Sequence, residues 1–170
     1  MSRWALAPTM PKAKEFRPNG YHTVTHAIVV DNATKALAFY TKALGAKIRT
    51  QAPGPNGSVL HAEIQIGDSV IFLSDEFPMS DIKSPKKLGG TSAGVWLYVP
   101  DADATFKQAV AAGAKVTQEL QDMFWGDRFG SFIDPFGHAW SVATHVEDLT
   151  PEEIEKRRVA AMRDFPPPSK

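Results

Sequence analysis

Two side chains that could exchange protons stand two positions apart, at His61 and Glu63. The surrounding residues, 59–66, alternate between apolar and polar types, which predicts a strand with His61 and Glu63 on one face. An imidazole beside a carboxylate can act as a base with its orienting group, or as two ligands of an unusual metal site. A hydrogen-bonded pair on a solvated sheet face is the alternative interpretation.

The second half of the chain carries further side chains that could bind a ligand. The planar guanidinium of Arg128 could hold a substrate carboxylate, or it could clamp Asp127 or Asp134. Trp125 could form an aromatic wall of a pocket or fill the core. His145 has the same strand parity as Ser141 and is expected at the cavity mouth.

The elements that must position these residues follow a repeated order. A strand over 21–30 is followed by a helix that Asp31 or Asn32 caps and Gly45 ends, and then by three strands. A second strand, helix and three strands follow, with Asp101 or Asp103 as the helix cap and Gly113 as its end. The predicted strands after the first are 47–51, 59–66, 70–73, 94–99, 115–120, 124–133 and 139–144.

This repetition predicts two βαβββ modules in one chain. We divide the chain into an arm (1–20), a domain (21–146) and a C-terminal helix and tail (147–170). The domain comprises module one (21–75), a connection (76–93) and module two (94–146). Thr150-Pro151-Glu152-Glu153 fits a helix capping box, and Pro166 to Pro168 end that helix. The predicted buried set is Val24, Ile28, Leu37, Tyr40, Leu97, Phe106, Val110, Trp140 and Val142.

Composition excludes several classes of function. The 19 Lys and Arg residues balance 19 Asp and Glu residues, so no nucleic-acid or anionic-membrane partner is expected. No apolar run approaches the roughly 18 residues of a membrane span, and the first twenty residues lack a signal-peptide core. Zero cysteines exclude disulfides and thiolate metal sites. The expectation is a soluble, cytoplasmic protein.

Several motifs give the chain a family resemblance from about residue 21 to 145. They are Phe39-Tyr40…Leu44-Gly45-Ala46, His61-Ala62-Glu63…Gly67-Asp68-Ser69, Trp125-Gly126-Asp127-Arg128 and Asp134-Pro135-Phe136-Gly137-His138. With the paired modules, they resemble the vicinal oxygen chelate superfamily of glyoxalase I, bleomycin-resistance proteins and extradiol dioxygenases, and within it the PhnB-like subgroup with a Trp-Gly-Asp-Arg motif. The resemblance implies an α+β fold in which two βαβββ modules form an eight-stranded, cup-shaped mixed sheet covered by helices.

The resemblance also raises the question of a metal. Enzymes of this superfamily hold a divalent ion with side chains from their first, fourth, fifth and eighth strands. In this sequence the matching positions are Thr25, Phe72, Gly94 and Ser141, and none of these is a strong ligand. We therefore expect neither a metal nor another cofactor.

The resulting hypothesis is a metal-free protein that captures an aromatic or amphipathic small molecule in the sheet cavity. One alternative is a lyase, isomerase or dioxygenase, either metal-dependent with displaced ligands or metal-free with His61 and Glu63 as acid and base. Another is a degenerate module that acts only through a dimer surface. The superfamily commonly pairs, so a homodimer is expected, with Trp4, Leu6, Phe16 and Ile154 as contacts. The predicted ligand-binding residues are Thr25, Phe72, Trp96, Tyr98, Trp125, Arg128, Ser141 and His145.

Overall fold

The structure is a computed structural model that describes residues 12–164, so the predictions for Trp4, Leu6 and Pro166 to Pro168 lie outside it. Module one contains β1 (His26–Val30), α1 (Ala33–Leu44), β2 (Lys47–Pro53), η1 (Pro55–Gly57), β3 (Val59–Ile66) and β4 (Ser69–Asp75). The connection contains α2 (Pro85–Leu88). Module two contains β5 (Gly94–Tyr98), α3 (Ala102–Ala111), β6 (Lys115–Asp122), β7 (Asp127–Ile133) and β8 (Ala139–His145). α4 (Pro151–Ala161) and η2 (Met162–Asp164) follow.

The two modules share one strand topology, which confirms the α+β class and the two βαβββ modules. Sheet A has the order β1-β4-β3-β2, and sheet B has the corresponding order β5-β8-β7-β6. In each sheet the first and last strands of the module pair in parallel, while the other neighbours are antiparallel. The eight strands are thus divided into two hydrogen-bonded sheets of four.

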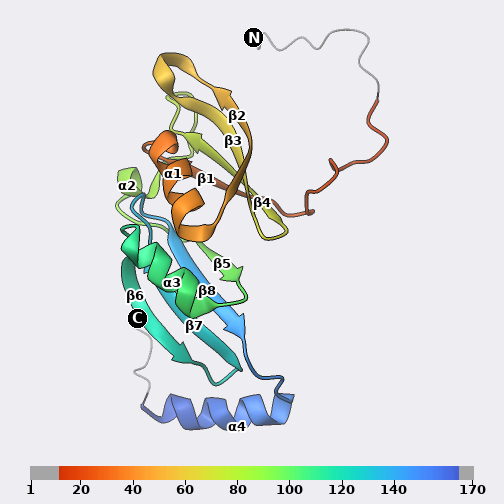
Figure 1. The fold of residues 1–170 in the computed structure, drawn as a ribbon, viewed down its shortest axis with the longest axis vertical. Helices are drawn as coiled ribbons and strands as arrows, with labels where there is room; N and C mark the ends of the chain where they lie inside the picture. The colour runs from red at the N-terminus through yellow and green to blue at the C-terminus, as the bar shows by residue number, and fades with distance from the viewer. Residues whose placement is uncertain (1–11, 165–170) are drawn as a thin grey trace.

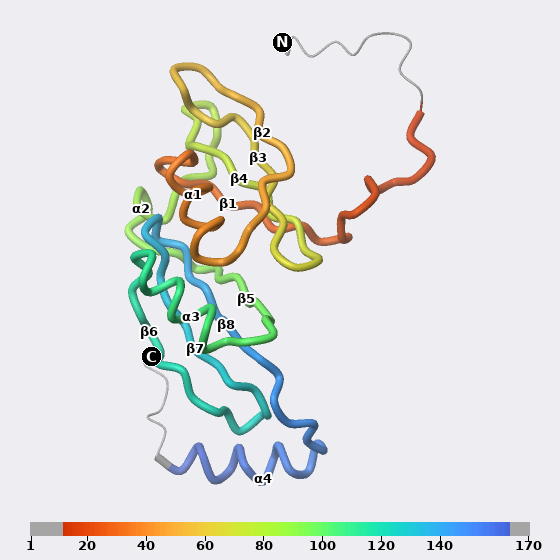
Figure 2. Tube along the Cα trace, viewed as in Figure 1, coloured from red at the N-terminus to blue at the C-terminus, as the bar shows by residue number. Residues whose placement is uncertain are grey.

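The modules lie end to end along the long axis of the molecule (Figures 1 and 2). α1 and α3 contact each other and lie on the same side of their sheets (Figure 1). We call the sheet surfaces away from these helices the open face of sheet A and the open face of sheet B. α4 crosses the far end of module two, and the segment from residue 12 to 20 runs outward from module one (Figure 1).

Local capping explains where the helices begin and end. The Asn32 side chain accepts a hydrogen bond from the Lys35 amide at the start of α1, and Gly45 ends this helix with a left-handed φ of 64°. Asp101 caps α3 in the same way through the Ala104 amide. Thr150 and Glu153 form the predicted capping box of α4. Of the alternatives left open by the sequence, Asn32 and Asp101 are therefore the caps.

A buried carboxylate joins the two modules. Asp134, in the turn between β7 and β8, is 4% exposed. Its Oδ2 accepts hydrogen bonds from the Tyr40 hydroxyl of α1 at 2.6 Å and from Trp140 Nε1 at 2.9 Å. Its Oδ1 accepts from the backbone amides of Phe136 and His138. Because all four donors are satisfied by one side chain, Asp134 fixes both its own turn and the contact between the modules.

Most of the predicted buried set is confirmed. Ile28, Leu37, Tyr40, Phe106, Trp140 and Val142 are buried, and Leu97 packs against the core cluster. Two predictions are wrong: Val24 is 85% exposed and Val110 is 38% exposed. β1 begins at His26 rather than at residue 21, so Val24 precedes the strand, and Val110 lies near the end of α3 on its outer side.

Candidate functional site

An aromatic ring organises the open face of sheet A. Phe72 of β4 lies between the Tyr21 ring, with centroids 6.0 Å apart, and the His61 ring, with centroids 5.1 Å apart. Strand pairing sets Phe72 beside Glu63 on β3 and beside Ala27 on β1. The structure therefore brings the predicted pair His61 and Glu63 next to Phe72.

Glu63 is the polar centre of this face. Its Oε2 accepts a hydrogen bond from the Tyr21 hydroxyl at 2.7 Å, and its Oε1 lies 3.5 Å from His61 Nε2. The hydrogen bond from Tyr21 holds the pKa of the Glu63 carboxyl below its usual value, because it stabilises the ionised form. The same bond raises the pKa of the Tyr21 hydroxyl. The guanidinium of Arg49 lies over the Tyr21 ring, 4.9 Å from its centroid.

Thr25 lines a hollow of about 360 Å³ on this face, with Tyr21, Glu63 and Phe72. The arm residues Phe16, Arg17 and Pro18 form its other wall. The Thr25 hydroxyl donates to the His22 carbonyl oxygen at 3.3 Å. Thr25 and Phe72 therefore belong to module one's part of the predicted site.

Four aromatic rings gather on the open face of sheet B. Trp96 of β5 stacks on Phe129 of β7, with centroids 4.7 Å apart and an angle of 25° between the rings. Tyr98 lies 6.2 Å from Trp96, and Trp125 packs edge-on against Phe129 at 5.8 Å. Trp96 and Tyr98 are 48% and 60% exposed, which is unusual for rings of this size. This face offers a flat stacking surface to a ligand.

A buried carboxylate, Asp127, holds two of these rings, Tyr98 and Trp125, in place. Its Oδ2 accepts from the Tyr98 hydroxyl at 2.8 Å and from Trp125 Nε1 at 3.0 Å, and its Oδ1 lies 2.8 Å from His145 Nδ1. Burial by itself raises the pKa of Asp127, but the hydrogen bonds from His145, Tyr98 and Trp125 outweigh it, so that the pKa lies below its usual value.

His145 joins this buried carboxylate to the segment before α4. Its second ring nitrogen, Nε2, lies 3.0 Å from Asp148 Oδ1. Carboxylates only accept hydrogen bonds, so the two contacts favour an imidazolium with both nitrogens protonated. The hydrogen bonds to Asp127 and Asp148 accordingly raise the pKa of His145 above its ordinary value.

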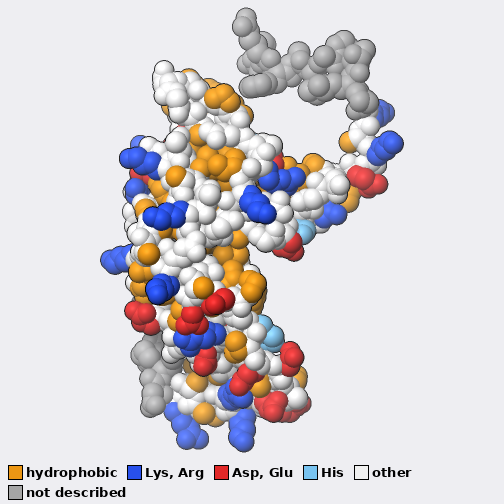
Figure 3. All heavy atoms as spheres, in the orientation of Figure 1, with side chains coloured by type: hydrophobic (Ala, Val, Ile, Leu, Met, Phe, Trp, Pro, Cys, Tyr) orange, Lys and Arg blue, Asp and Glu red, His pale blue; other side chains and the backbone are white. Residues whose placement is uncertain are grey.

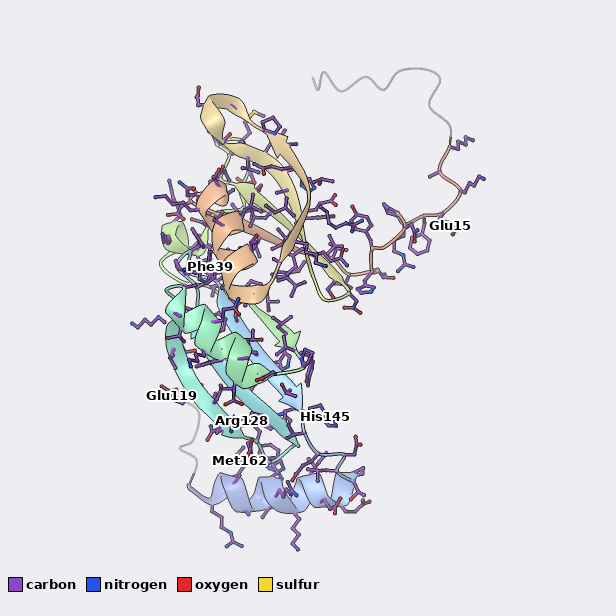
Figure 4. All side chains as sticks on the ribbon, viewed as in Figure 1. Glu15, Phe39, Glu119, Arg128, His145 and Met162 are labelled. Atoms are coloured by element: carbon purple, nitrogen blue, oxygen red, sulfur yellow. The ribbon has the colours of Figure 1, made fainter. Side chains whose placement is uncertain are left out.

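A cavity of about 490 Å³ lies between the aromatic face of sheet B and the C-terminal helical segment. Trp96, Trp125 and Phe129 form one side, and Ala161 and Met162 form part of the other. Figure 4 labels Met162 and His145 at this end of module two, which α4 covers. Ser141 pairs with Trp96 in the sheet, so it shares the open face.

Arg128 lies on the other surface of sheet B, toward α3. Its Nε and Nη2 donate to the two carboxylate oxygens of Asp103 at 2.6 and 2.8 Å, and its Nη1 donates to Asp122 at 3.2 Å. These bonds hold the fork of Arg128 between the start of α3 and the end of β6 (Figure 4). The guanidinium contacts neither Asp127 nor Asp134, the partners considered from the sequence, and it does not line the aromatic cavity.

Apart from Arg128, the predicted ligand-binding residues therefore separate into two groups. Trp96, Tyr98, Trp125, Ser141 and His145 share sheet B, whereas Thr25 and Phe72 share sheet A. A third hollow of about 360 Å³ lies at the junction, where Trp96 and Tyr98 meet the β3–β4 turn and residues just before β1.

The donor set does not fit a metal at the positions that the resemblance indicates. The parallel pairing places Ala27 beside Phe72 and Trp96 beside Ser141, while Gly94 pairs with Ala139. Thr25 and Ser141 supply only neutral hydroxyls, and the other side chains supply no donor that a divalent ion prefers. Among residues 12–164, no three His, Asp or Glu side chains are grouped so that they could hold an ion.

Several functional candidates did not stand out in the sequence. Tyr21 completes the Glu63 cluster, and Phe129 completes the aromatic stack. Gln118 and Gln121 of β6 line the aromatic cavity. The alternation of side chains along residues 127–133 predicts that Asp127 and Phe129 lie on one face of the strand and Arg128 on the other. The sequence does not indicate which of these faces is open, because that depends on how the helices pack.

Comparison with known proteins gives a consistent result. Residues 21–142 match the family model described as Glyoxalase/Bleomycin resistance protein/Dioxygenase superfamily. An uncharacterised protein of Mycobacterium tuberculosis is 43% identical over 131 residues, which cover 75% of this chain and 77% of the relative. A gene product of Arabidopsis thaliana is similar in structure, with a TM-score of 0.60, 25% identity, and coverage of 72% of this chain and 98% of the other. A PhnB protein from Bacillus cereus shares the fold, with a TM-score of 0.57, 16% identity, and coverage of 72% and 99%.

Within residues 12–164, no helix combines the length and the apolar character that a membrane span requires.

Proposed function

Since this chain belongs to the Glyoxalase/Bleomycin resistance protein/Dioxygenase superfamily, we propose that it is a small-molecule-binding protein that captures an aromatic or amphipathic compound without a metal. The ligand stacks on the open face of sheet B. The observation that carries this proposal is the Trp96–Phe129 stack, which leaves a large ring half exposed beside a cavity of about 490 Å³. That volume lies within the range of small-molecule sites.

The hydrogen bonds of Asp127 support the same proposal. A carboxylate with a side chain only 3% exposed fixes Tyr98 and Trp125, so neither ring must be ordered when a ligand arrives. Rings that are already held in place lower the entropic cost of binding. This is the arrangement expected of a preformed aromatic site, and it requires no chemical step.

The experiment is a titration with planar probes of three charge types: lumichrome, which is neutral, 2-naphthoate, which is anionic, and N-methylacridinium, which is cationic. At least one is expected to bind, and Trp96→Ala should weaken that binding by more than about tenfold. The matched control is Phe72→Ala on sheet A, which should leave the affinity unchanged. The proposal fails if no probe binds, or if the two variants have equal effects.

Metal independence has its own measurement. The residues at the expected metal positions do not fit a divalent ion, so added zinc, nickel, iron or manganese should not raise the melting temperature. A bound probe should raise it, because ligands that bind only the folded state stabilise it. One metal per chain in the purified protein, lost on replacing His61 or Glu63, would contradict the proposal.

The cluster on sheet A favours a second candidate function, a metal-free enzyme that transfers protons. Tyr21 and His61 both contact Glu63, so Glu63 can orient His61 as the base. Such an enzyme would exchange the proton on a carbon next to a carbonyl. Deuterium exchange into hydroxyacetone, followed by NMR and abolished by Glu63→Gln, would support it.

We also propose that the chain is cytoplasmic, that it forms a homodimer, and that its arm, domain and tail are divided as the sequence indicates. Exposed apolar side chains on separate elements support pairing: Phe16 is 87% exposed, and Val24 of module one is 85% exposed. Ile154 of α4 is half-buried. Sedimentation at tens of micromolar should show a dimer, whereas a monomer would contradict this proposal.

A further inference from the structure

The cavity between sheet B and the C-terminal helical segment contains two amide side chains that the stacking surface alone does not require. Gln118 and Gln121 lie on β6, opposite Ser131 and Phe129, and both line the cavity. Among the described residues, the amide nitrogen of Gln118 has only a weak contact, 3.9 Å from the sulfur of Met123. These amides can therefore both donate to and accept from a ligand.

Asp122 is the one charged side chain among the described residues that line this cavity, and its carboxylate accepts a hydrogen bond from Arg128. Asp122 is paired with Arg128 at 3.2 Å, and Asp127 is paired with His145 at 2.8 Å. Within residues 12–164, the lining of this cavity includes no Lys, Arg or His. Acidic and basic side chains interleave over module two and α4 on the face shown in Figure 3. An anionic ligand would therefore find no cation on the described cavity wall, and the one carboxylate there is already bonded to Arg128, which it shares with Asp103.

From this combination we infer that the cavity selects a neutral, planar heteroaromatic compound, whose ring stacks on the Trp96 and Trp125 side and whose polar edge is read by Gln118 and Gln121. This inference rests on the proposed function and specifies its ligand class. Paired amides suit a ring edge that carries both N–H donors and carbonyl or ring-nitrogen acceptors, since a glutamine can satisfy one of each. Leaving those amides unpaired under a bound hydrocarbon would be unfavourable.

Met123 and Met162 suit the same occupant. They lie on the cavity wall beside the aromatic rings, and thioether side chains are polarisable and can adjust to the outline of a flat ring. The alternative is that the exposed rings attract a cation through their π faces. Replacing the glutamines distinguishes a neutral heteroaromatic ligand from a cation, because only the neutral ligand should lose affinity.

The test uses the full chain and the same three probes. Lumichrome should bind at least about tenfold more tightly than 2-naphthoate or N-methylacridinium. Gln118→Leu and Gln121→Leu should each weaken lumichrome by about fivefold to tenfold, the contribution of a lost hydrogen bond, and leave the other probes within about twofold. Gln51→Leu, which removes an exposed glutamine from β2 of module one, should change none of the affinities.

A second variant keeps the inference falsifiable if a leucine disturbs the cavity. Gln121→Glu keeps the shape of the side chain and adds an uncompensated charge, so N-methylacridinium should gain affinity and lumichrome should lose it. If a charged probe binds wild-type protein most tightly, or if the glutamine variants bind lumichrome as well as wild type does, the ligand class is wrong although the binding function stands. If no probe binds, the proposed function fails as well.

Discussion

The two modules repeat one backbone plan but carry different chemistry on their open faces. On sheet A, the Phe72 ring lies between the rings of Tyr21 and His61, which both contact the carboxylate of Glu63. On sheet B, four aromatic rings surround a buried carboxylate, Asp127, with three partners. The two modules therefore share a topology, while their side chains decide what chemistry each open face offers.

The turns that join the last two strands of each module differ in the same way. In module one, β3 and β4 are joined through Gly67 and Asp68, and the Asp68 side chain is 88% exposed. In module two, the turn holds Asp134 with four hydrogen bonds, two of them to side chains. The core contact between modules depends on the second turn and not on the first.

The largest expected effect tests this difference between the turns. Asp134→Ala should lower the free energy of unfolding by about 3 to 5 kcal/mol, because it leaves several buried donors without an acceptor. Asp68→Ala, at the corresponding turn, should change it by less than about 0.5 kcal/mol. Denaturant unfolding measures both, and equal losses in the two variants would show that the turns are equivalent.

The next effect compares the two carboxylates. Asp127→Asn should cost about 1 to 3 kcal/mol, since an amide cannot accept from all three donors. Glu63→Gln should cost less than about 1 kcal/mol, because one of its two contacts is long. Near-UV circular dichroism should also change more in the Asp127 variant, in which Tyr98 and Trp125 lose their acceptor. A larger loss in the Glu63 variant would reverse the comparison.

A smaller effect concerns pH. The pKa of His145 is raised in the folded protein, so its contribution to stability is fully present below its unfolded pKa of about 6.5. That contribution is lost as the pH rises through the folded pKa of His145. The unfolding free energy should therefore fall as the pH rises above about 6.5, and His145→Gln should remove this component.

The control for this pH effect is His22→Gln, which replaces an exposed histidine of module one and should retain the decrease. Asp127 contributes in the opposite direction. The pKa of its carboxyl is lowered on folding, so its stabilisation is present above about pH 4 and is lost at lower pH. A wild-type profile that stays flat as the pH rises above about 6.5 would contradict the coupling of His145 to both carboxylates.

The smallest expected effect is on ligand affinity when Arg128 is replaced. Because its guanidinium is bound to Asp103 and Asp122 on the helix side of sheet B, Arg128→Leu should leave the affinity for lumichrome within about twofold. The titration used for Trp96→Ala provides the measurement. A tenfold loss would show that Arg128 reaches the ligand after all.

The sequence by itself determined the repeated βαβββ modules and the residues at which several helices begin or end. Glycine and capping signals such as Gly45, Asn32 and Thr150 act within a few residues, so they can be read without tertiary structure. The parity of β3 likewise placed His61 and Glu63 on one face, as the structure has them. Val24 was predicted to be buried because the apolar alternation begins several residues before β1. Residues 21–25 have no strand partner in sheet A, so the strand begins only at His26.

Only the tertiary structure decided which side chains meet. Asp127 receives hydrogen bonds from β5, the β6–β7 turn and β8. Because these segments lie far apart along the chain, no local sequence pattern predicts that they contact one carboxylate. Arg128 contacts Asp103 because α3 packs on its side of sheet B. Its neighbour Asp127 points to the opposite side, where the aromatic rings lie. Irregular register between β6 and β7 placed both Gln118 and Gln121 at the cavity. Local propensity fixes elements, whereas register and helix packing fix the face on which each residue lies.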